Sequence, residues 1–301
     1  MKSPSSHKTR QLKTKSTSKP KKTRSTKPSQ SQATRHRIEH PELYEKTSET
    51  AQQGERIQKL LAQGGMGSRR EIEGWIKQGL IRVDGRKAEL GQRITILDRI
   101  EIRGRRVNLE KKLGGPTRVL MYNKPTGEIV ARRDPGGRPL VFSRFPKPDR
   151  GRWITVGRLD INTEGLLLAT TNGELANQLM HPSSELEREY AVRVLGEITE
   201  DMAQQLLAGV ELEDGIAHFD KIDFSGGEGA NKWYHVTVTQ GRNRVIRRLM
   251  ASQGLQVSRL TRVRYGSIRL PSWLKTGKTT ELSDKEIKRL RQTFDSNFTD
   301  E

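Results

Sequence analysis

The residues best suited to chemistry in this chain lie in the stretch VGRLDINTEGLLLATTNGEL, residues 156–175. This stretch places one carboxylate, Asp160, two positions after Arg158 and shortly before an apolar run. Gly157 and Gly165 bracket the acid, so we expect a tight loop that leads into a buried strand or helix. A carboxylate in such a setting is costly unless a cation accompanies it. The residues alone leave two interpretations open, a structural salt bridge within the loop and a catalytic acid.

Several familiar active-site patterns are missing from the sequence. The six histidines show no metal-ligand spacing, and neither a Gly-x-x-x-x-Gly-Lys-Ser/Thr loop nor a Gly-x-Ser-x-Gly elbow occurs. Metal, nucleoside triphosphate and serine-hydrolase chemistry therefore lose support. A pair of catalytic carboxylates is harder to exclude, because Glu164 and Glu174 lie near Asp160 in the sequence. Sequence proximity alone does not make such a pair.

The charge of the chain favours a polyanionic partner. Lys and Arg number 56 against 36 Asp and Glu, which gives a formal net charge of +20. Nucleic acid is therefore the expected partner. No stretch approaches about 18 consecutive apolar residues, so no membrane-spanning helix and no membrane partner are predicted. The start of the chain lacks the apolar core of a secretory signal, and the absence of cysteine agrees with a reducing compartment, so we expect a cytoplasmic protein.

Residues 1–50 are a mixture of Ser, Thr, Lys, Arg, Gln and Pro. The first 40 residues contain 12 Lys or Arg and one acid, Glu39, and so supply +11 of the net charge. Such a segment cannot bury enough apolar surface to offset its ordering entropy, and we predict a disordered basic tail. It is either a nonspecific phosphate-binding arm or a solubilising extension. The remainder of the chain still carries +9 and is basic in its own right.

Residues 55–104 are predicted to form a compact module of two helices and a small sheet. Apolar residues at i, i+3 and i+4 predict a first helix, and Ser68 with Glu71 predicts a capping box at the start of a second. The segment LIRVDGRKAEL predicts two short strands joined by a turn at Asp84 and Gly85. Several cations of the second helix and the hairpin are expected to flank one surface: Arg69, Arg70, Lys77, Arg82, Arg86 and Lys87.

Residues 119–282 are predicted to form a larger α+β domain on a mixed, mainly antiparallel sheet. Strands are predicted at VLMYNKPTGEI, LEREYAVRVLGEI, WYHVTVTQ and VSRLTRVRYGSIRL, and helices at GELANQLM, EDMAQQLLAG and NRVIRRLM. Tyr190 alternates with valines along its strand, a pattern that by itself favours a core residue. Residues 105–118 are expected to be a linker, and residues 283–301 a C-terminal helix and tail.

Two long stretches of the larger domain resemble one group of ribosomal pseudouridine synthases, those designated A for the small ribosomal subunit and B, E and F for the large one. They are VGRLDINTEGLLLATTNGELANQLMHPSSELEREYAVRVLG and QGRNRVIRRLMASQGLQVSRLTRVRYGSI. The segment SRREIEGWIKQGLIRVDGR of the smaller module resembles the S4 RNA-binding domain. The resemblance runs from about Glu55 to Pro271. One departure is Gln240, where acidic residues are commoner in the family.

The resemblance implies an S4-type α/β module followed by a pseudouridine synthase catalytic domain, with no cofactor and no metal. Asp160 would be the catalytic aspartate, acting on the ribose as nucleophile at C1′ or as base at C2′. Tyr190 would stack on the uracil. Arg247 would lower the pKa of the carboxylate, and Arg158 would take the place in the stack that a flipped base leaves. The expected RNA-binding residues are Arg158, Arg69, Arg70, Lys77, Arg82 and Arg244.

The function implied is the isomerisation of a specific uridine of large-subunit (23S) ribosomal RNA by a monomer, on naked RNA or on an assembly intermediate. Three alternatives remain open at this point: a noncatalytic RNA-binding assembly factor, the same chemistry on small-subunit RNA, and a nuclease or RNA glycosidase. A binding protein has no physical need for a carboxylate that faces RNA. The sequence shows no carboxylate cluster that would hold the Mg²⁺ ions of a two-metal nuclease.

The two interpretations of the basic tail are separated by deleting residues 1–50. We expect the deletion to weaken RNA affinity and to flatten its dependence on salt, without eliminating the chemistry, because fewer counterions are released on binding. The measurement is the RNA dissociation constant as a function of salt concentration for the full and shortened chains. An unchanged salt slope would show the tail to be a bystander.

Overall fold

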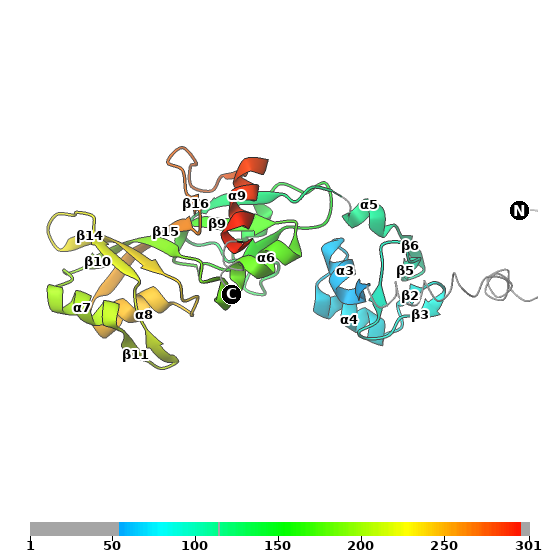
Figure 1. Ribbon diagram of the computed structural model, residues 1–301, viewed down its shortest axis with the longest axis horizontal. Helices are drawn as coiled ribbons and strands as arrows, with labels where there is room; N and C mark the ends of the chain where they lie inside the picture. Colours follow the sequence, from blue (N-terminus) through cyan, green and yellow to red (C-terminus); the bar gives the residue numbers. More distant parts are fainter. Residues whose placement is uncertain (1–53, 114, 296–301) are drawn as a thin grey trace, which may run out of the picture. The chain divides into compact units, whose positions relative to one another are not determined.

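The computed structural model describes residues 54–113 and 115–295 (Figure 1). The basic tail predicted for residues 1–50 and the end of the tail predicted after the last helix lie outside the described residues. Within the described ranges, no helix combines the length and the apolar character needed to cross a bilayer.

The small module has its own apolar core, built from two helices and short strands. Its helices are α3 (Ile57–Gln63) and α4 (Arg69–Lys77). The strands are β1 (Glu55–Arg56), β2 (Ile81–Val83), β3 (Arg86–Lys87), β4 (Arg93–Ile94), β5 (Ile100–Ile102) and β6 (Arg105–Val107). Four of them form a sheet in the order β3-β2-β5-β6, and β1 pairs with β4. The predicted capping box is present, because Ser68 Oγ accepts from the Glu71 backbone N–H at 3.1 Å and the Glu71 carboxylate accepts from that of Ser68 at 2.8 Å.

The expected linker at residues 105–118 differs from what the structure shows. Its first residues form β6, which pairs with β5, and the next form the short helix α5 (Leu109–Leu113). The physical reason is apolar burial: Leu109 is 2 % exposed and packs into the core of the small module with Val107. The sequence interpretation gave too much weight to the Lys and Gly residues around these two side chains.

The larger domain is an α+β structure on one nine-stranded sheet, as predicted. The main path of the sheet has the order β13-β14-β10-β15-β9-β7-β17, with β16 on β15 and β8 on β9. Among the described strands of this sheet, only β9 and β15 pair in parallel. The strands are β7 (Val119–Lys124), β8 (Ile154–Val156), β9 (Glu164–Thr170), β10 (Arg188–Leu195), β13 (Lys221–Phe224), β14 (Asn231–Val238), β15 (Gln256–Tyr265), β16 (Ile268–Arg269) and β17 (Thr279–Glu281).

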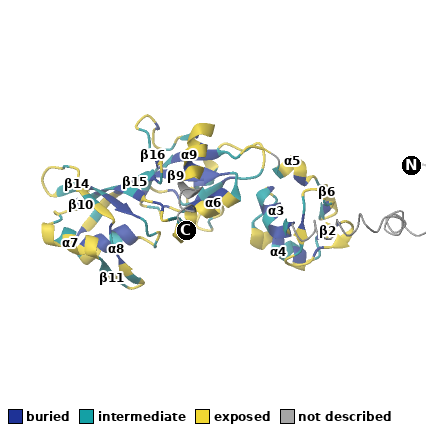
Figure 2. Cartoon of the chain, in the orientation of Figure 1, coloured by how far each residue is buried: buried dark blue, intermediate teal, exposed yellow. Residues whose placement is uncertain are grey.

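The helices of this domain are α6 (Gly173–Met180), α7 (Glu200–Ala208), α8 (Val245–Ser252) and α9 (Asp284–Asp295). A small hairpin, β11 (Val210–Leu212) and β12 (Gly215–Ala217), lies next to α8. Two apolar clusters form the main cores (Figure 2). In the first, α7 and α8 pack on β10 and β14; in the second, α6 and α9 pack on β7 and β9. The alternation predicted for β10 is confirmed, since Tyr190, Val192 and Val194 are buried on one face.

The parallel contact between β9 and β15 requires a glycine at position 165. Gly165 pairs with Arg262, and a Cβ at position 165 would lie 2.4 Å from the Arg262 carbonyl oxygen. The glycine also has φ of +97°, a conformation that L side chains rarely adopt. β9 directly follows the loop that carries Asp160, so this contact fixes the position of the end of that loop.

Substituting Gly165 by Ala tests the close approach. We expect the Gly165→Ala chain to lose at least about 2 kcal/mol of unfolding free energy, from backbone strain and overpacking together. Gly157→Ala is the matched control, because Gly157 also has positive φ but no atom within 4 Å of its would-be Cβ; it should lose only about 1 kcal/mol. Urea unfolding measures both. Equal losses would contradict the close approach.

Candidate active site

A cavity of about 510 Å³ opens in the larger domain, within the range of roughly 300–1,000 Å³ that small-ligand sites occupy. Its wall combines the loop between β8 and β9, the start of β10, the segment that leads into α8, and β15. These segments are far apart in the sequence and meet only because the sheet order places β10 and β15 side by side. Five of the residues expected to act on RNA line this one cavity: Arg158, Asp160, Tyr190, Arg244 and Arg247.

The charge of the cavity wall is strongly uneven. Asp160 is the single acid among the described residues that line it, whereas six arginines do so. The six are Arg158, Arg188, Arg242, Arg244, Arg247 and Arg262. A concave surface with this balance attracts an anionic ligand and keeps a lone carboxylate in a positive field.

Asp160 lies on the predicted loop, which ends in strand β9. Its side chain is exposed, and among the described residues no hydrogen bond or ion pair holds its carboxylate. Water therefore reaches the carboxylate in the free chain, because the cavity is open on the side of the acid. The loop itself is firmly anchored: the buried Lys124 ammonium donates to the carbonyl oxygens of Thr163 at 2.9 Å and Pro125 at 2.8 Å.

Lys124 is a cation that the sequence interpretation did not single out. Burial lowers its pKa to about 8, and the charges of Glu128, Asp160 and Glu164 oppose that shift. The carboxylate of Asp160 thus lies within electrostatic range of a fully buried ammonium. The signal in the sequence was a lysine within the apolar strand of the segment VLMYNKP, where a cation needs dedicated acceptors.

Arg247 contacts the loop of Asp160 in a different way from the one expected. Its guanidinium donates to the carbonyl oxygens of Asn162 at 2.8 Å and Val257 at 2.9 Å. Burial and the charge of Arg244 lower the pKa of Arg247, and the charge of Asp160 raises it. The two side chains interact through their charges without an ion pair, and Arg247 fastens the loop two residues beyond Asp160.

The helix that carries Arg247, predicted from the sequence, buries one apolar face. Its buried residues are Val245, Ile246, Leu249 and Met250. Arg244 precedes the helix in a left-handed conformation, φ 49°, and its side chain is exposed at the cavity. Arg248 forms an ion pair with Asp214 of the β11–β12 hairpin at 2.7 Å.

The predicted RNA-binding cations of the small module are all exposed. Arg69 and Arg70 begin α4, Lys77 ends it, and Arg82 occupies the middle of β2. Their exposure leaves the charged groups available to phosphates, since no ion pair among the described residues neutralises any of the four.

The sequence did not point to several residues of the cavity, among them Arg188, Arg262 and Tyr265. Both guanidiniums lie against the Tyr265 ring, with their carbon atoms 5.2 and 5.1 Å from its centroid. Arg262 is 2 % exposed and Arg188 9 %. Two buried arginines on one aromatic ring are a costly arrangement, and the alternation of strand residues gives no hint of it.

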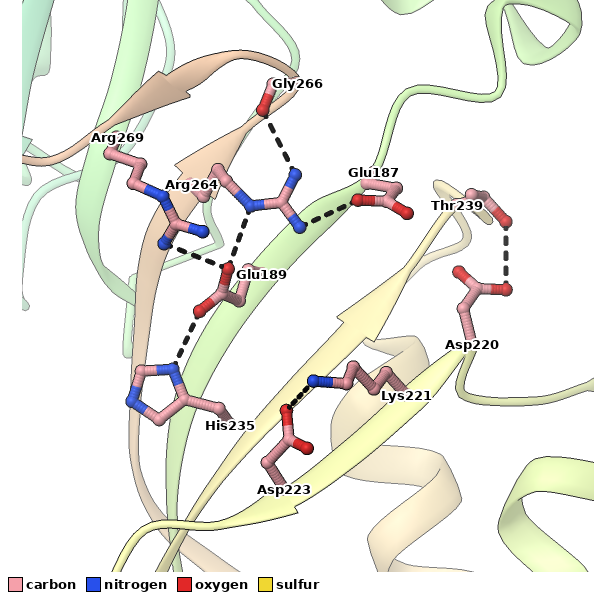
Figure 3. Close-up of polar contacts among 10 residues, drawn as sticks. All are labelled: Glu187, Glu189, Asp220, Lys221, Asp223, His235, Thr239, Arg264, Gly266 and Arg269. Carbon is pink, nitrogen blue, oxygen red and sulfur yellow. Dashed lines mark hydrogen bonds and ion pairs between the residues drawn. The ribbon is translucent and has the colours of Figure 1, made fainter.

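A polar cluster holds β10 from the face of the sheet opposite the cavity (Figure 3). We call it the Glu189 cluster; its members are Glu187, Glu189, His235, Arg264 and Arg269. The Glu189 carboxylate accepts from Arg264 Nε at 2.8 Å, contacts His235 Nδ1 at 2.9 Å and lies 3.2 Å from Arg269 Nη1. Arg264 also donates to Glu187 at 2.8 Å. Three strands, β14, β10 and β15, with β16 beside them, are thereby tied together directly behind Tyr190.

Comparisons with known proteins agree with this geometry. The profile of the RNA pseudouridylate synthase family matches residues 118–252, and that of the S4 domain matches residues 55–100. The chain is 55 % identical over 241 residues to "Ribosomal large subunit pseudouridine synthase B" of Yersinia pestis, covering 79 % of this chain and 76 % of that protein.

The chain belongs to the RNA pseudouridine synthases. A relative with the same name from Escherichia coli (strain K12) is 54 % identical over 240 residues, which cover 79 % of this chain and 82 % of the relative. The solved "Crystal structure of pseudouridylate synthase" shares the fold, with a TM-score of 0.55 and 24 % identity over 78 % of this chain and 99 % of that one. The resemblance drawn from the sequence motifs is confirmed, and so is the order of an S4 module before the synthase domain.

The Glu189 cluster predicts how stability of this synthase depends on pH. Burial raises the pKa of Glu189, but hydrogen bonds from Arg264 and His235 and the charges of Arg269 and Arg264 outweigh it and lower the pKa to about 2, from 4.5. Because the folded-state pKa is depressed, the charged form stabilises the fold above about pH 4.5, and this contribution is lost as the pH falls toward 2.

Glu189→Gln should therefore lower the unfolding free energy at neutral pH by about 1 to 3 kcal/mol, and the difference from wild type should shrink toward about pH 3. The measurement is urea unfolding at the two pH values. Glu187→Gln is the control: its carboxylate is 54 % exposed, so its loss should cost less than about 1 kcal/mol. A Glu189→Gln effect of the same size at both pH values would contradict the assigned cause.

Proposed function

We propose that this chain isomerises a specific uridine of large-subunit ribosomal RNA to pseudouridine, with Asp160 as the catalytic carboxylate. The observation that carries the proposal is the single cavity in which Asp160, Tyr190 and Arg247 meet from three separate segments. The relatives supply the substrate class, since the proteins that this chain resembles at 54–55 % identity bear the name of a large-subunit synthase. The same names favour the large-subunit target over a small-subunit one.

The reaction rearranges atoms of one nucleotide and needs no other reactant. The N1–C1′ bond breaks, the released uracil turns within the site, and C5 forms the new bond to C1′; the proton on C5 leaves and N1 gains one. As nucleophile, Asp160 would attack C1′ and later be displaced by C5. As base, it would remove the proton on C2′ and return it after the new bond forms. Either role requires the ionised carboxylate.

The proposed roles of three other cavity residues follow from their positions. Tyr190 is 8 % exposed and presents its ring to the cavity, which suits stacking on a uracil. Arg247 holds the loop through Asn162 and adds positive charge beside Asp160. Arg158 is exposed at the cavity, where it can occupy the gap that a flipped base leaves in the RNA stack.

Exposure of Asp160 in the free chain is consistent with this proposal, because the substrate itself would close the cavity. A flipped nucleotide enters from the open side and displaces water from around the carboxylate. The arginines at the opening, Arg158 and Arg244, would meet the phosphates on either side of the flipped residue.

Binding of the RNA is assigned to backbone charge and shape. Arg244 at the cavity and the exposed cations of the small module would contact phosphates of a stem-loop; the latter are Arg69, Arg70, Lys77 and Arg82. The substrate is ribosomal RNA, naked or in an assembly intermediate, and the proposal includes a monomer that works in the cytoplasm where ribosomes assemble.

The test is chemical mapping of pseudouridine on large-subunit ribosomal RNA incubated with the purified protein. We expect one modified uridine with wild type and a rate at least about 10⁴-fold lower with Asp160→Asn, because the amide can neither attack nor accept a proton. RNA affinity should stay within about tenfold, since phosphate contacts dominate binding.

Asp223→Asn is the matched control, because it makes the same chemical change at an exposed carboxylate that pairs with Lys221 on β13 (Figure 3). It should modify the RNA at the wild-type rate. Full turnover by Asp160→Asn would refute the role of Asp160. Absence of pseudouridine with wild type, on both naked RNA and pre-ribosomal particles, would refute the substrate.

A further inference from the structure

Arg262 has a hydrogen-bond donor that no described residue uses. Its side chain is 2 % exposed and lines the cavity, and its Nε donates to the Leu166 carbonyl oxygen at 2.7 Å. Its Nη2 is buried without any hydrogen-bond partner. A buried, unpaired guanidinium nitrogen is expensive, of the order of 1–3 kcal/mol or more, so its persistence at a binding cavity points to a ligand acceptor.

The position of Arg262 follows from a β-bulge. Glu189 pairs with Arg264, but the next residue of β10, Tyr190, pairs with Arg262, so β15 contains one extra residue at this point. Without the bulge, Arg262 and Arg264 would point to the same face, because strand residues two apart do so. With it, Arg264 joins the Glu189 cluster behind the sheet (Figure 3) and Arg262 lies beside Tyr190 at the cavity.

The depth of Arg262 decides which part of a nucleotide it can meet. The exposed arginines of the cavity, Arg158 and Arg244, lie where the RNA backbone and its phosphates must stay. Arg262 is buried and is the cross-strand neighbour of Tyr190, the residue assigned to stack on the base. A group that reaches this far inward is the base itself, and the acceptors on a uracil edge are its carbonyl oxygens at C2 and C4.

We propose that Arg262 is a base-binding residue that donates a hydrogen bond from Nη2 to a carbonyl oxygen of the flipped uracil. This inference rests on the proposed function. It gives the buried donor an acceptor, and it selects against cytosine in one orientation of the base, because cytosine carries an amino donor at C4. Tyr265 supports the side chain from behind, and its own hydroxyl is fixed by donating to the Leu179 carbonyl oxygen at 2.6 Å.

The symmetry of uracil makes such a donor useful throughout the reaction. Moving the sugar bond from N1 to C5 corresponds to a half-turn of the base about the axis through N3 and C6. That half-turn exchanges the C2 and C4 carbonyls as well as N1 and C5. A donor that meets one carbonyl before the turn therefore meets the other after it. Arg262 would hold the base in both orientations and lose its bond only during the rotation.

The test uses the ribosomal stem-loop that carries the mapped uridine, with uridine, 2-thiouridine or 4-thiouridine at that position. Sulfur accepts hydrogen bonds more weakly than oxygen, so wild type should react more slowly in single turnover on the thio-substrates. Arg262→Met should react about 10- to 100-fold more slowly on uridine, with RNA affinity within about threefold, and should show little further slowing on sulfur substitution. Arg262→Lys, which keeps the charge, should recover part of the rate.

Arg193→Met is the control for loss of one positive charge in the sheet, since Arg193 lies on β10 and donates to Ser258 at 2.9 Å. It should keep both the wild-type rate and the wild-type sulfur effect. An equal sulfur effect in wild type and Arg262→Met would overturn the proposal, even if Arg262→Met is slow, because it would show a structural role alone. So would an absence of any sulfur effect in wild type, a result that needs no variant to fold. The proposed function stands or falls separately, on whether wild type modifies uridine at all.

Discussion

The bulge in β15 opposite Glu189 and Tyr190 is the constraint on which the site depends. It separates two arginines of one strand, sending Arg264 to the back of the sheet and Arg262 to the cavity. The Glu189 cluster locks this irregularity, because a carboxylate with two hydrogen-bonded partners and a third nearby cation holds β15 in the shifted register. One residue of slippage would return Arg262 to the wrong face and leave Glu189 without its guanidinium.

The hydrogen bonds of the cations around Asp160 explain why this carboxylate is not held in an ion pair. Six arginines line the cavity with Asp160, yet none forms an ion pair with it among the described residues. Arg247 donates its hydrogen bonds to the carbonyl oxygens of Asn162 and Val257, and Lys124 to those of Pro125 and Thr163. The cations thus hold the loop by its backbone and leave the oxygens of the Asp160 carboxylate without an ion pair.

The sequence predicted most of the regular elements, and its predictions failed where an irregular backbone sets the position of a side chain. Hydrophobic spacing located α4, α6, α8 and the alternation of β10, and two glycines located the loop of Asp160. Arg262 was missed because period-two alternation places it on the face of Arg264, and only the bulge reverses that. Lys124 was missed because its hydrogen-bond acceptors are backbone carbonyl oxygens, and the types of the residues do not reveal where those oxygens lie. The partnership of Arg247 with Asp160 was implied by the family motif, and a motif does not specify which atoms make the hydrogen bonds.

The cations of the cavity floor are buried whereas the acid is exposed, and this difference follows from the cost of solvation. Arg262 and Arg188 are already buried in the free protein, so the free-energy cost of removing them from water is met during folding. The floor of the cavity therefore has its final arrangement before a ligand binds. The carboxylate of Asp160 stays in water until a nucleotide covers it, which spares the free protein the larger cost of a buried, unpaired anion. Under the proposed function, the desolvation of the acid would be coupled to binding of a flipped base, and the carboxylate would lie in a dry cavity only when its substrate is present.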